Sequence, residues 1–423
     1  MAVTLSSVAD VCARAREAAR TLAQTDTVTK NAALRAIAAD LRTRSQEILA
    51  ANELDLIAGR EADIGAALLD RLALDESRIE SIAWAVESIA SLGDPVGETI
   101  DGHRLPNGMD VRKVRVPLGV IAVVYEARPN VTIDAACLCL KSGNAIVLRG
   151  SSSAANSNAV LCSIAAEAAV GVGLPDGSIG LVAGGGRGEL AELATQDDSI
   201  DLLIPRGGEG LKAALKDVAS VPVIYAASGN CHVYVDASAD IEQALAIVLN
   251  AKTQRPGVCN AAETLLVHEA LTSSFLPKVL AELSAAGVQL RADERAAHIA
   301  AQAGVPVQVA VAEDWDTEYL AMTLAVAVVD STEQAIEHIA HHGSGHSEAI
   351  LTKDTADARA FQLGVDAACV YVNASTRFTD GGEFGMGAEI GNSTQKLHAR
   401  GPIGLRELCT FKYLVEGAGH VRP

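Results

Sequence analysis

The sequence predicts an α/β protein with two successive parallel sheets covered by helices. From residue 118 onward, short aliphatic runs alternate with segments of helical periodicity, the order of a doubly wound parallel sheet. Hydrophobic residues make up 49% of the chain and aromatic residues only 3%, so Ala, Val, Leu and Ile must build most of the core. The chain has 423 residues, and a prior of about 100–200 residues per domain predicts two to three domains.

Helices are expected over residues 5–92. Their apolar side chains recur three and four residues apart and so share one helix face, as do Ala33, Leu34, Ile37 and Leu41. The pattern changes at 95–117, where the turn dipeptides Asp101-Gly102 and Asn107-Gly108 precede an alternation of polar and apolar residues. We expect a β-hairpin there that protrudes between domains.

Two series of strands follow the hairpin. The first is expected at 119–125, 145–148, 178–183, 202–204, 222–225 and 232–235, with helices over 130–140 and 156–170. A second α/β unit begins near residue 237, with strands expected at 264–267, 307–311, 324–329, 349–351 and 370–372. A last strand is expected at 409–415. It has no obvious local partner, so pairing with the hairpin and pairing with another subunit both stay open.

Charge and hydropathy exclude several classes of function. The formal net charge of −19 disfavours binding to nucleic acid. Arginines recur through the only apolar stretch near the N-terminus, so no signal peptide is expected, and no uncharged apolar run of about 18 residues predicts a membrane helix. We therefore expect a cytoplasmic protein with neither nucleic-acid nor membrane partners. Local arginines can still create an anion-binding cleft.

Cysteine and histidine spacing gives no metal site. The eight cysteines are scattered without a CxxC pair, which argues against a zinc ribbon or a redox dithiol. Most are expected to be buried free thiols of a reducing compartment. His338, His341 and His342 have a helical spacing that a metal could use, but a solvated helix end that complements the helix dipole is the favoured interpretation. No metal is expected.

Cys259 differs from the other cysteines. It follows Arg255 in the loop segment 253–260, which contains Pro and Gly and lies between a helix and the strand expected at 264–267. The thiolate is the reactive form, so a catalytic cysteine needs an electropositive and partly exposed setting. Arg255 and Lys252 are expected to supply it. The spacing alone leaves a buried structural cysteine open as the alternative.

Two glycine-rich turns, 148–152 and 204–210, follow expected strands. Free N–H groups at a helix N-terminus bind phosphate, and glycines allow close approach of the backbone. At the carboxyl ends of neighbouring strands, the two turns together predict a nucleotide site. The long polar loop 373–385 is interpreted as a ligand loop rather than a surface linker. Neither G-x-G-x-x-G nor a Walker loop is present.

Several longer stretches then allow a specific comparison. They lie between about residues 113 and 412 and comprise 115–120, 125–132, 204–208, 231–236, 251–256 with Cys259, 371–382 and 393–401. Among them are Tyr125-Glu-Ala-Arg-Pro-Asn-Val-Thr132 and Tyr371-Val-Asn-Ala-Ser-Thr-Arg-Phe-Thr-Asp-Gly-Gly382. In sequence and order they resemble the γ-glutamyl phosphate reductase family of the aldehyde dehydrogenase superfamily.

The resemblance implies an aldehyde dehydrogenase-like α/β fold in three parts. A Rossmann-type cofactor domain would comprise residues 1–98 and 119–235, and an α/β catalytic domain would comprise 236–402. A β-hairpin oligomerisation flap would comprise 99–118 and 403–423. The superfamily's Rossmann variant lacks the usual glycine fingerprint, so its absence here agrees with the resemblance.

The resemblance also implies roles for single residues. Cys259 matches the nucleophile. Arg206, Gly207 and Gly208 match the turn that faces the cofactor's phosphates. Arg149 and Ser151 match the contacts to the adenosine ribose, where an arginine and serine hydroxyls would suit a 2′-phosphate. Glu318 aligns with the carboxylate that holds the nicotinamide ribose.

Two departures from the superfamily pattern affect the chemistry. The segment that usually supplies an Asn to the oxyanion is here 125–130, so either Asn130 takes that role or backbone donors serve alone. The general-base Glu-Leu-Gly-Gly motif is replaced by 227–232, which holds no carboxylate. Loss of the base argues against a hydrolytic aldehyde dehydrogenase.

The implied activity is NADPH-dependent reduction of L-glutamyl 5-phosphate to L-glutamate 5-semialdehyde and phosphate, the second step of proline biosynthesis from glutamate. It would proceed through a thioester on Cys259. Arg128, Arg255 and Arg377 are the candidates for the leaving phosphate and the α-carboxylate. A homo-oligomer is expected, and glutamate 5-kinase is a candidate partner. The alternatives are a thiol hydrolase that pairs Cys259 with His232 and a catalytically silent partner of the kinase.

Overall fold

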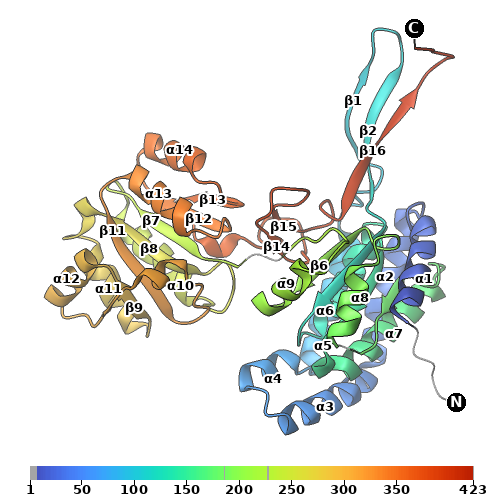
Figure 1. Ribbon diagram of the computed structural model, residues 1–423, viewed down its shortest axis with the longest axis horizontal. Helices are drawn as coiled ribbons and strands as arrows, with labels where there is room; N and C mark the ends of the chain where they lie inside the picture. The colour runs from blue at the N-terminus through green and yellow to red at the C-terminus, as the bar shows by residue number, and fades with distance from the viewer. Residues whose placement is uncertain (1–6, 185, 226–227, 423) are drawn as a thin grey trace. The chain divides into compact units, whose positions relative to one another are not determined.

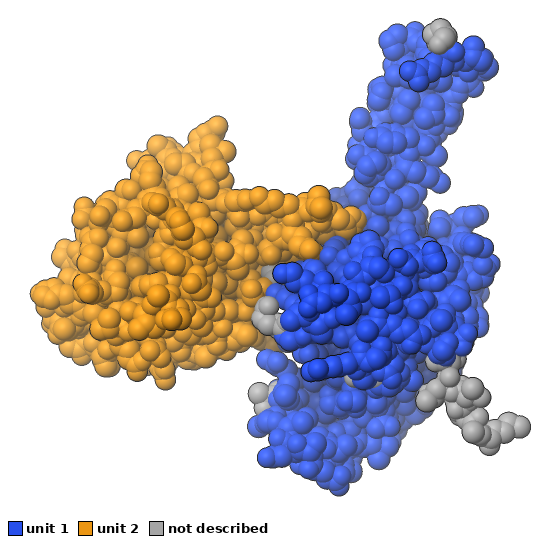
Figure 2. Space-filling view, in the orientation of Figure 1, with its two compact units in different colours: residues 1–226, 385–391, 403–423 blue, residues 227–384, 392–402 orange. Residues whose placement is uncertain are grey.

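The chain folds into two compact units in a computed structural model that describes residues 7–184, 186–225 and 228–422. Unit 1 comprises Met1–Ala226, Gly385–Gly391 and Ile403–Pro423, and unit 2 comprises Ala227–Phe384 and Asn392–Pro402 (Figure 2). The chain therefore returns twice to unit 1 after it has built most of unit 2. The sequence places the corresponding division nine residues later, at 235/236.

Helices fill the N-terminal part of unit 1, as predicted. They are α1 (Val8–Leu22), α2 (Thr27–Thr43), α3 (Ser45–Glu61), α4 (Ala66–Leu72) and α5 (Glu76–Ser91). Side chains cap three of them: Ser7 begins α1 with a capping box, Asp26 caps α2 and Asp75 caps α5. The residues predicted to share one face of α2, such as Leu34 and Leu41, are fully buried.

A parallel four-stranded sheet in the order β5-β4-β3-β6 forms the centre of unit 1 (Figure 1). Its strands are β3 (Val120–Tyr125), β4 (Ala145–Arg149), β5 (Ile179–Leu181) and β6 (Leu202–Arg206). The connecting segments hold α6 (Asn130–Lys141), η1 (Ser152–Ala154), α7 (Ala155–Gly171), α8 (Arg187–Ala194) and α9 (Glu209–Lys216). Helices α1, α6 and α7 pack on the sheet, and α2, α3 and α5 pack on α6 or α7.

A separate three-stranded antiparallel sheet, hereafter the flap sheet, extends away from the rest of unit 1 (Figure 1). It consists of β1 (Thr99–Arg104), β2 (Asp110–Pro117) and β16 (Cys409–Glu416). The predicted hairpin is confirmed, and β16 pairs with β2 from Cys409↔Pro117 to Glu416↔Asp110. Of the two partners left open for the last strand, the hairpin is therefore the one observed within the chain.

Unit 2 is built on a parallel seven-stranded sheet in the order β10-β9-β11-β8-β7-β12-β13. The strands are β7 (Cys231–Val235), β8 (Ala262–His268), β9 (Gln289–Ala292), β10 (Gln308–Val309), β11 (Thr323–Val329), β12 (Ser347–Leu351) and β13 (Cys369–Val372). The helices are α10 (Ile241–Thr253), η2 (Glu269–Leu271), α11 (Leu276–Ala285), α12 (Glu294–Gln302), η3 (Ala312–Asp316), α13 (Thr332–His342), α14 (Thr355–Gly364) and η4 (Thr376–Phe378). Strands β14 (Asn392–Ser393) and β15 (Gly401–Pro402) form a small pair of their own.

Both faces of the seven-stranded sheet are buried, which explains its continuous aliphatic strands. Val233 and Leu265 join a core that α10, α11 and α12 complete. Tyr234 and Leu266, one residue further along the same strands, join a second core on α13 and α14. Successive side chains of a strand point to opposite faces, so the three helices α10–α12 cover one face and α13 and α14 cover the other.

Three sequence-based strand assignments need correction, and one strand was missed. The segment 222–225 is not a strand but makes one parallel bridge, Leu203↔Val223, because Pro222 has no N–H to extend the ladder. The strand expected at 232–235 exists as β7, but it lies in the second sheet, between β8 and β12. The strand expected at 307–311 shrinks to the two residues of β10, and β9 was not predicted.

No helix in the described part of the chain is long and apolar enough to cross a membrane.

Candidate active site

Cys259 lies in the loop between α10 and β8, at the amino edge of the seven-stranded sheet. Strands β7, β8 and β12 are parallel neighbours, so the residues that precede them meet at this edge. Of the eight cysteines, all of which the structure describes, Cys259 alone is partly exposed and the other seven are buried. The alternative of a buried structural cysteine is therefore excluded for this position.

Burial suppresses the reactivity of most other thiols. Desolvation raises the pKa of Cys12, Cys162 and Cys409 to about 12. It also raises the pKa of Cys137, Cys139 and Cys231 far above that of a free thiol. These six side chains remain thiols at neutral pH, and the seventh buried cysteine, Cys369, is only 8% exposed. The partly exposed Cys259 is therefore the candidate nucleophile.

Two arginines give the Cys259 loop a positive environment. Arg377 in η4 is half-buried, and its Nε donates to Gln254 Oε1 at 2.9 Å. Burial lowers the pKa of Arg377, as does the neighbouring charge of Arg255, while negative charge on Cys259 would raise it. Arg377 therefore lies near enough to Cys259 to stabilise a thiolate, and Arg255 lies near Arg377.

Lys252 does not take part as the sequence suggested. Its side chain is fully buried, and its Nζ lies 2.5 Å from Oε2 of Glu263, which is also fully buried. The lysine charge is therefore compensated inside unit 2 rather than presented to Cys259. Of the two cations expected for this loop, only Arg255 keeps that assignment.

The backbone of Cys259 is packed against Gly229, which precedes β7. A Cβ atom at position 229 would lie 1.5 Å from the Cys259 carbonyl oxygen, so only glycine fits. The Gly229 N–H donates to Glu318 Oε1 at 2.7 Å, and the Cys231 thiol donates to the Cys259 carbonyl at 3.2 Å. Gly229 and Cys231, within the segment 227–232 that replaces the general-base motif, thus contact the backbone of the nucleophile.

The ligand loop predicted at 373–385 is bound to the same region. Asn260 Nδ2 donates to the carbonyls of Thr379 at 2.9 Å and Arg377 at 3.3 Å, and Thr376 Oγ1 donates to the Asn260 carbonyl at 2.7 Å. Beside Gln254 and Arg377 there is an open pocket of about 250 Å³. It is lined by Asn250, Gln254, Arg377, Phe378, Asp380 and Glu383.

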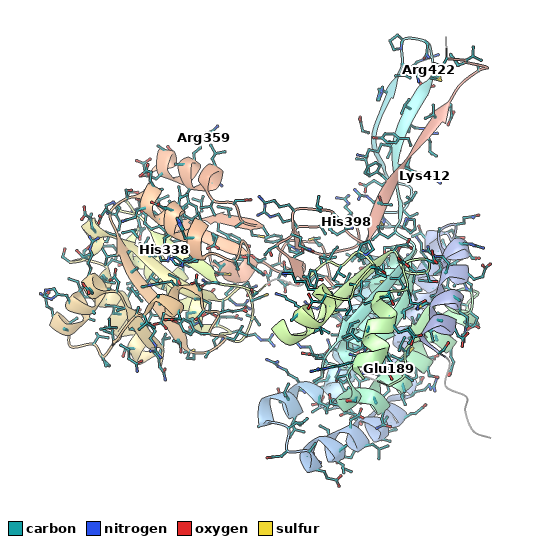
Figure 3. All side chains as sticks on the ribbon, viewed as in Figure 1. Glu189, His338, Arg359, His398, Lys412 and Arg422 are labelled. Carbon is teal, nitrogen blue, oxygen red and sulfur yellow. The ribbon has the colours of Figure 1, made fainter. Side chains whose placement is uncertain are left out.

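His232 is not arranged as a base for a thiol hydrolase. Its ring is fully buried, Nδ1 lies 3.0 Å from Glu348 Oε2, and Nε2 has no hydrogen-bond partner. The ring packs against His338 on α13, which is labelled in Figure 3. Both nitrogens are thus turned toward the core rather than toward a solvent-accessible thiol.

The glycine-rich turns of unit 1 lie at the carboxyl edge of its sheet, on either side of β3, as predicted. Arg149 ends β4 and is 7% exposed; its Nη2 donates to the Gly186 carbonyl at 2.7 Å, and its buried Nε has no partner. Burial lowers the pKa of Arg149, which Glu189 and Glu126 partly oppose. Ser151 Oγ accepts the Ala127 N–H at 3.2 Å.

The second turn brings Arg206, Gly207 and Gly208 from β6 into α9. A Cβ atom at Gly207 would lie 2.8 Å from the carboxyl carbon of Glu126, so glycine is what allows this carboxylate to pack directly on the turn. The Gly208 N–H, at the start of α9, donates to Glu126 Oε2 at 3.3 Å. A carboxylate thus occupies the position where a helix N-terminus favours an anion.

The remaining predicted site residues divide between the units. Glu318 lies in unit 2 beside Gly229 and Cys259. Arg128 and Asn130 lie in unit 1, after β3, where Arg128 is exposed. Asn130 Nδ2 donates to Asp134 Oδ2 at 2.8 Å, within the first turn of α6, and burial raises the pKa of Asp134 to about 6.

Among the described residues, no group of three or more His, Cys, Asp or Glu side chains could hold a metal ion. The histidines at the end of α13 instead make separate contacts. His342 Nδ1 lies 2.8 Å from Asp316 Oδ1, and His341 Nδ1 lies 2.8 Å from the Glu337 carbonyl.

Comparison with known proteins assigns this geometry to a family. The model of the aldehyde dehydrogenase family matches residues 2–303. The chain belongs to the aldehyde dehydrogenase family. Enzymes of this family are oxidoreductases that use a nicotinamide cofactor. The turns of unit 1 fit such a group because Gly208 has open space where a side chain would lie and Arg149 has an unpartnered Nε.

Close relatives within the family confirm the resemblance found in the motifs. The γ-glutamyl phosphate reductases of Thermobifida fusca and Moorella thermoacetica are each 54% identical to this chain. The alignment covers 98% of both chains for the first and 97% of both for the second. The crystal structure of γ-glutamyl phosphate reductase from Thermotoga maritima is 46% identical and has a TM-score of 0.96, covering 99% of this chain and 100% of that one.

Three residues of this site were not recognised from the sequence. Gly229 and Glu126 lie within stretches used for the resemblance or beside them, but their contacts join segments far apart in the chain. Glu263 had a visible signal, because a carboxylate inside the apolar run that becomes β8 requires a buried partner. The identity of that partner, Lys252, required the structure.

Proposed function

We propose that this chain reduces L-glutamyl 5-phosphate to L-glutamate 5-semialdehyde and inorganic phosphate with NADPH, the second step of proline biosynthesis from glutamate. The supporting observation is a single partly exposed cysteine, Cys259, whose loop contains Arg255 and lies near Arg377 of η4. The names of the nearly full-length relatives point to the same substrate.

The first half of the reaction uses the nucleophile loop. The Cys259 thiolate attacks the acyl carbon of the mixed anhydride, the C–O bond to phosphate breaks, and inorganic phosphate leaves with the bonding electrons. The product of this step is a γ-glutamyl thioester. Cations next to the loop stabilise the thiolate before attack and the phosphate as it departs.

The second half reduces the thioester. NADPH, when bound, supplies the hydride that the carbonyl carbon accepts. The resulting hemithioacetal collapses to the aldehyde and returns the electron pair to Cys259. Backbone N–H groups and Asn130 are the proposed donors to the oxygen, and one such donor contributes about 2.7–4 kcal/mol in other enzymes.

The anionic groups of the substrate require arginines. Arg377 faces the open pocket beside the Cys259 loop, and Arg255 is its electrostatic neighbour, so these two are proposed for the phosphate and the α-carboxylate. Arg128 is the third candidate. The alanine substitutions of these three arginines, described in the Discussion, distinguish the arginine that binds phosphate from the others.

The cofactor is proposed to bind at the carboxyl edge of the unit 1 sheet. Arg206, Gly207 and Gly208 would face its phosphates, and Glu318 would hold the nicotinamide ribose. Arg149 and Ser151 would contact the adenosine ribose, with the unpartnered Nε of Arg149 suited to a 2′-phosphate. The Glu126 carboxylate must leave the start of α9 when a cofactor phosphate binds there.

The domain roles follow from these sites. With the bounds of the observed units, residues 1–98, 119–226 and 385–391 would form the cofactor domain, 227–384 and 392–402 the catalytic domain, and 99–118 with 403–423 an oligomerisation flap. The flap sheet exposes Phe411, Tyr413 and Val415 in one row of β16, which suits a homo-oligomer.

Sedimentation of two variants tests the oligomer. Tyr413→Asp places a charge in the exposed apolar row and should dissociate the assembly. Lys412→Asp changes its neighbour outside that row and should leave the assembly intact. A cytoplasmic location and contact with glutamate 5-kinase are also proposed.

A coupled assay tests the function. Glutamate 5-kinase, ATP and glutamate generate L-glutamyl 5-phosphate in place, and NADPH oxidation is followed by absorbance. Oxidation should require the kinase, ATP and this chain together. NADPH consumption that is absent under all conditions, or that is independent of the kinase, would contradict the proposal.

A further inference from the structure

The strand that follows the nucleophile carries a buried carboxylate. Glu263 lies on β8, four residues after Cys259, and its side chain is fully buried. Its Oε2 lies 2.5 Å from the Nζ of Lys252, near the end of α10. Glu263 thus joins the two elements on either side of the Cys259 loop.

The other oxygen of Glu263 holds a strained residue. Oε1 accepts the Leu320 N–H at 3.2 Å. Leu320 has a φ of +51°, in the left-handed region, which costs a non-glycine residue about 1–2 kcal/mol. Its side chain is 48% exposed, so apolar packing does not hold it in this conformation. The buried acceptor provided by Glu263 does so instead.

The Leu320 backbone in turn sets the position of Glu318, two residues earlier. Glu318 Oε1 accepts the Gly229 N–H, and Gly229 packs directly on the Cys259 carbonyl. The contacts form a closed circuit within unit 2: Cys259, Glu263, the loop of Leu320 and Glu318, Gly229, and Cys259 again. A change at Glu263 therefore reaches the nucleophile and the ribose carboxylate together.

We propose that Glu263 is a positioning residue: clamped by Lys252, it fixes the Leu320 backbone and thereby holds Glu318 in place for the nicotinamide ribose. The inference rests on the cofactor role proposed for Glu318. Glu263 is fully buried and does not touch the reacting atoms. Its proposed role is therefore in the binding and orientation of the cofactor rather than in the chemical step.

A simple stabilising ion pair is the competing explanation. Burial raises the pKa of Glu263 to about 7, which Lys252 partly opposes, and burial lowers the pKa of Lys252. A buried pair of this kind can often be replaced by apolar residues without loss of stability. The two explanations differ in what Oε1 does, since only the positioning role needs an acceptor for the Leu320 N–H.

Two double variants isolate that acceptor. Lys252→Met with Glu263→Gln removes both charges but keeps an amide oxygen that can accept from Leu320. Lys252→Met with Glu263→Met removes both charges and the acceptor. The affinity for NADPH is measured by titration of cofactor fluorescence, and the melting temperature is measured alongside. The Met/Gln variant should bind NADPH nearly as tightly as the wild type, and the Met/Met variant about tenfold more weakly.

Combining the two double variants with Glu318→Gln, as in a double-mutant cycle, shows whether Glu263 changes NADPH affinity through Glu318. In the Glu318→Gln background, the two double variants should bind NADPH equally, because the group that they position has already been altered. Equal affinity of the two double variants in the wild-type background would overturn the proposal, as would an undiminished difference in the Glu318→Gln background. These titrations need no substrate, so failure of the reductase assay would leave them interpretable.

A second buried lysine–carboxylate pair, in unit 1, is the control for the general effect of removing buried charges. Lys30 and Asp94 form a similar contact in unit 1, with Nζ 2.5 Å from Oδ2 and side chains 1% and 9% exposed. Lys30→Met with Asp94→Asn should lower the melting temperature without changing NADPH affinity. If the unit 2 variants do not fold, hydrogen exchange of the Leu320 amide is measured in the wild-type protein. The amide should be protected, because its N–H donates to the buried Glu263. Exchange at the rate of an exposed loop would overturn the proposal.

Discussion

At the scale of the residue, exposure and charge select one thiol from eight. The seven buried cysteines are chemically similar to Cys259, but burial keeps them from solvent, and desolvation raises the pKa of six of them. Cys259 avoids this because the loop after α10 carries it to the edge of the sheet, beside Arg255 and Arg377. Selectivity among the cysteines therefore comes from placement, and it can be measured directly.

Replacement of Cys259 by Ala should abolish turnover, by a factor of about 10³ or more, because the covalent step has no other nucleophile. Affinity for NADPH should change little, since the thiol is not among the cofactor contacts. Mass spectrometry after brief iodoacetamide treatment should find the label on Cys259 and none on Cys231. A Cys259→Ala enzyme that retains activity would exclude the mechanism.

Arg149 should determine the preference for NADPH over NADH. Its buried guanidinium has an unpartnered Nε, which a 2′-phosphate can accept from. Arg149→Ala should lower kcat/KM for NADPH about tenfold more than kcat/KM for NADH, because only one cofactor loses a charged hydrogen bond. The substitution also removes the hydrogen bond from Arg149 to the Gly186 carbonyl. Because NADH has no 2′-phosphate, the change in kcat/KM for NADH measures the effect of losing that bond alone. An equal fall for both cofactors would mean that the 2′-phosphate is not read by Arg149.

Single-residue roles were predictable from the sequence where they depend on local context. Cys259 could be selected from its loop, its neighbouring arginine and the family motif. Lys252 shared that local context, yet its charge is directed into the core by Glu263, eleven residues further along the chain. Pairings between distant segments are set by packing, which spacing alone does not encode.

At the scale of the element, the site is made by loops at the amino edge of one sheet. The segments before β7, β8 and β11 supply Gly229, Cys259 and Glu318 respectively. Parallel pairing brings these three loops together, because the starts of parallel neighbours share an edge. The closest packing among them is that of Gly229 on Cys259.

Gly229→Ala should therefore impair both folding and catalysis. The added methyl group would lie 1.5 Å from the Cys259 carbonyl oxygen, so the two loops must separate. Overpacking of this kind costs about 1–3 kcal/mol. The free energy of unfolding and kcat should both fall. Gly257→Ala, in the same loop but with its nearest neighbour at 3.7 Å, is the control and should have much smaller effects. Comparable losses in the two variants would contradict this account.

Element boundaries were predictable where the strand is long and central. The strand expected at 324–329 is β11, and the helix expected at 130–140 is α6, because buried aliphatic runs and helical periodicity are strong signals. The errors lie at the ends of the sheets. Strand β10 is an exposed edge of two residues, and β9 carries the polar residues Gln289 and Arg291, so neither has a clear hydrophobic signature.

At the scale of the whole molecule, unit 2 contains buried histidines that must stay neutral for the folded state to be stable. His346, just before β12, is 1% exposed; its Nδ1 lies 2.7 Å from Ser347 Oγ and 3.9 Å from Cys231 Sγ. Burial lowers the pKa of His346 to about 4. Burial also lowers the pKa of His338 to about 3, with help from neighbouring histidines.

These shifts predict loss of stability in mild acid. The unfolded chain takes up a proton near pH 6.5 while folded His346 stays neutral down to about pH 4, so the unfolded state binds more protons in this window. Stability should fall as pH falls, by about 3 kcal/mol for this group. His346→Gln should flatten the dependence of unfolding free energy on pH between 6.5 and 4. The exposed His298→Gln should not, and equal slopes in all three proteins would contradict the prediction.

The overall plan was predictable from the sequence, but the path of the chain between the units was not. Alternating strands and helices gave two α/β units, and the hairpin dipeptides gave the flap sheet. The return of 385–391 to unit 1 lies within the loop that follows β13, where polar and glycine residues carry no periodicity. Such a loop is placed by its tertiary contacts, here including Gly387 against Leu92.

The central claim is that Cys259 passes an acyl group to and from phosphate rather than to water. The segment 227–232 carries no carboxylate, and His232 is buried, so neither supplies the general base of a hydrolytic aldehyde dehydrogenase. We propose that a bound and oriented phosphate is the acceptor instead. The decisive measurement follows NADPH formation from L-glutamate 5-semialdehyde and NADP⁺ in phosphate-free buffer, before and after phosphate is added. Turnover should begin only with phosphate and should need more of it in Arg255→Ala, Arg377→Ala or Arg128→Ala. Sustained turnover without phosphate would contradict the account.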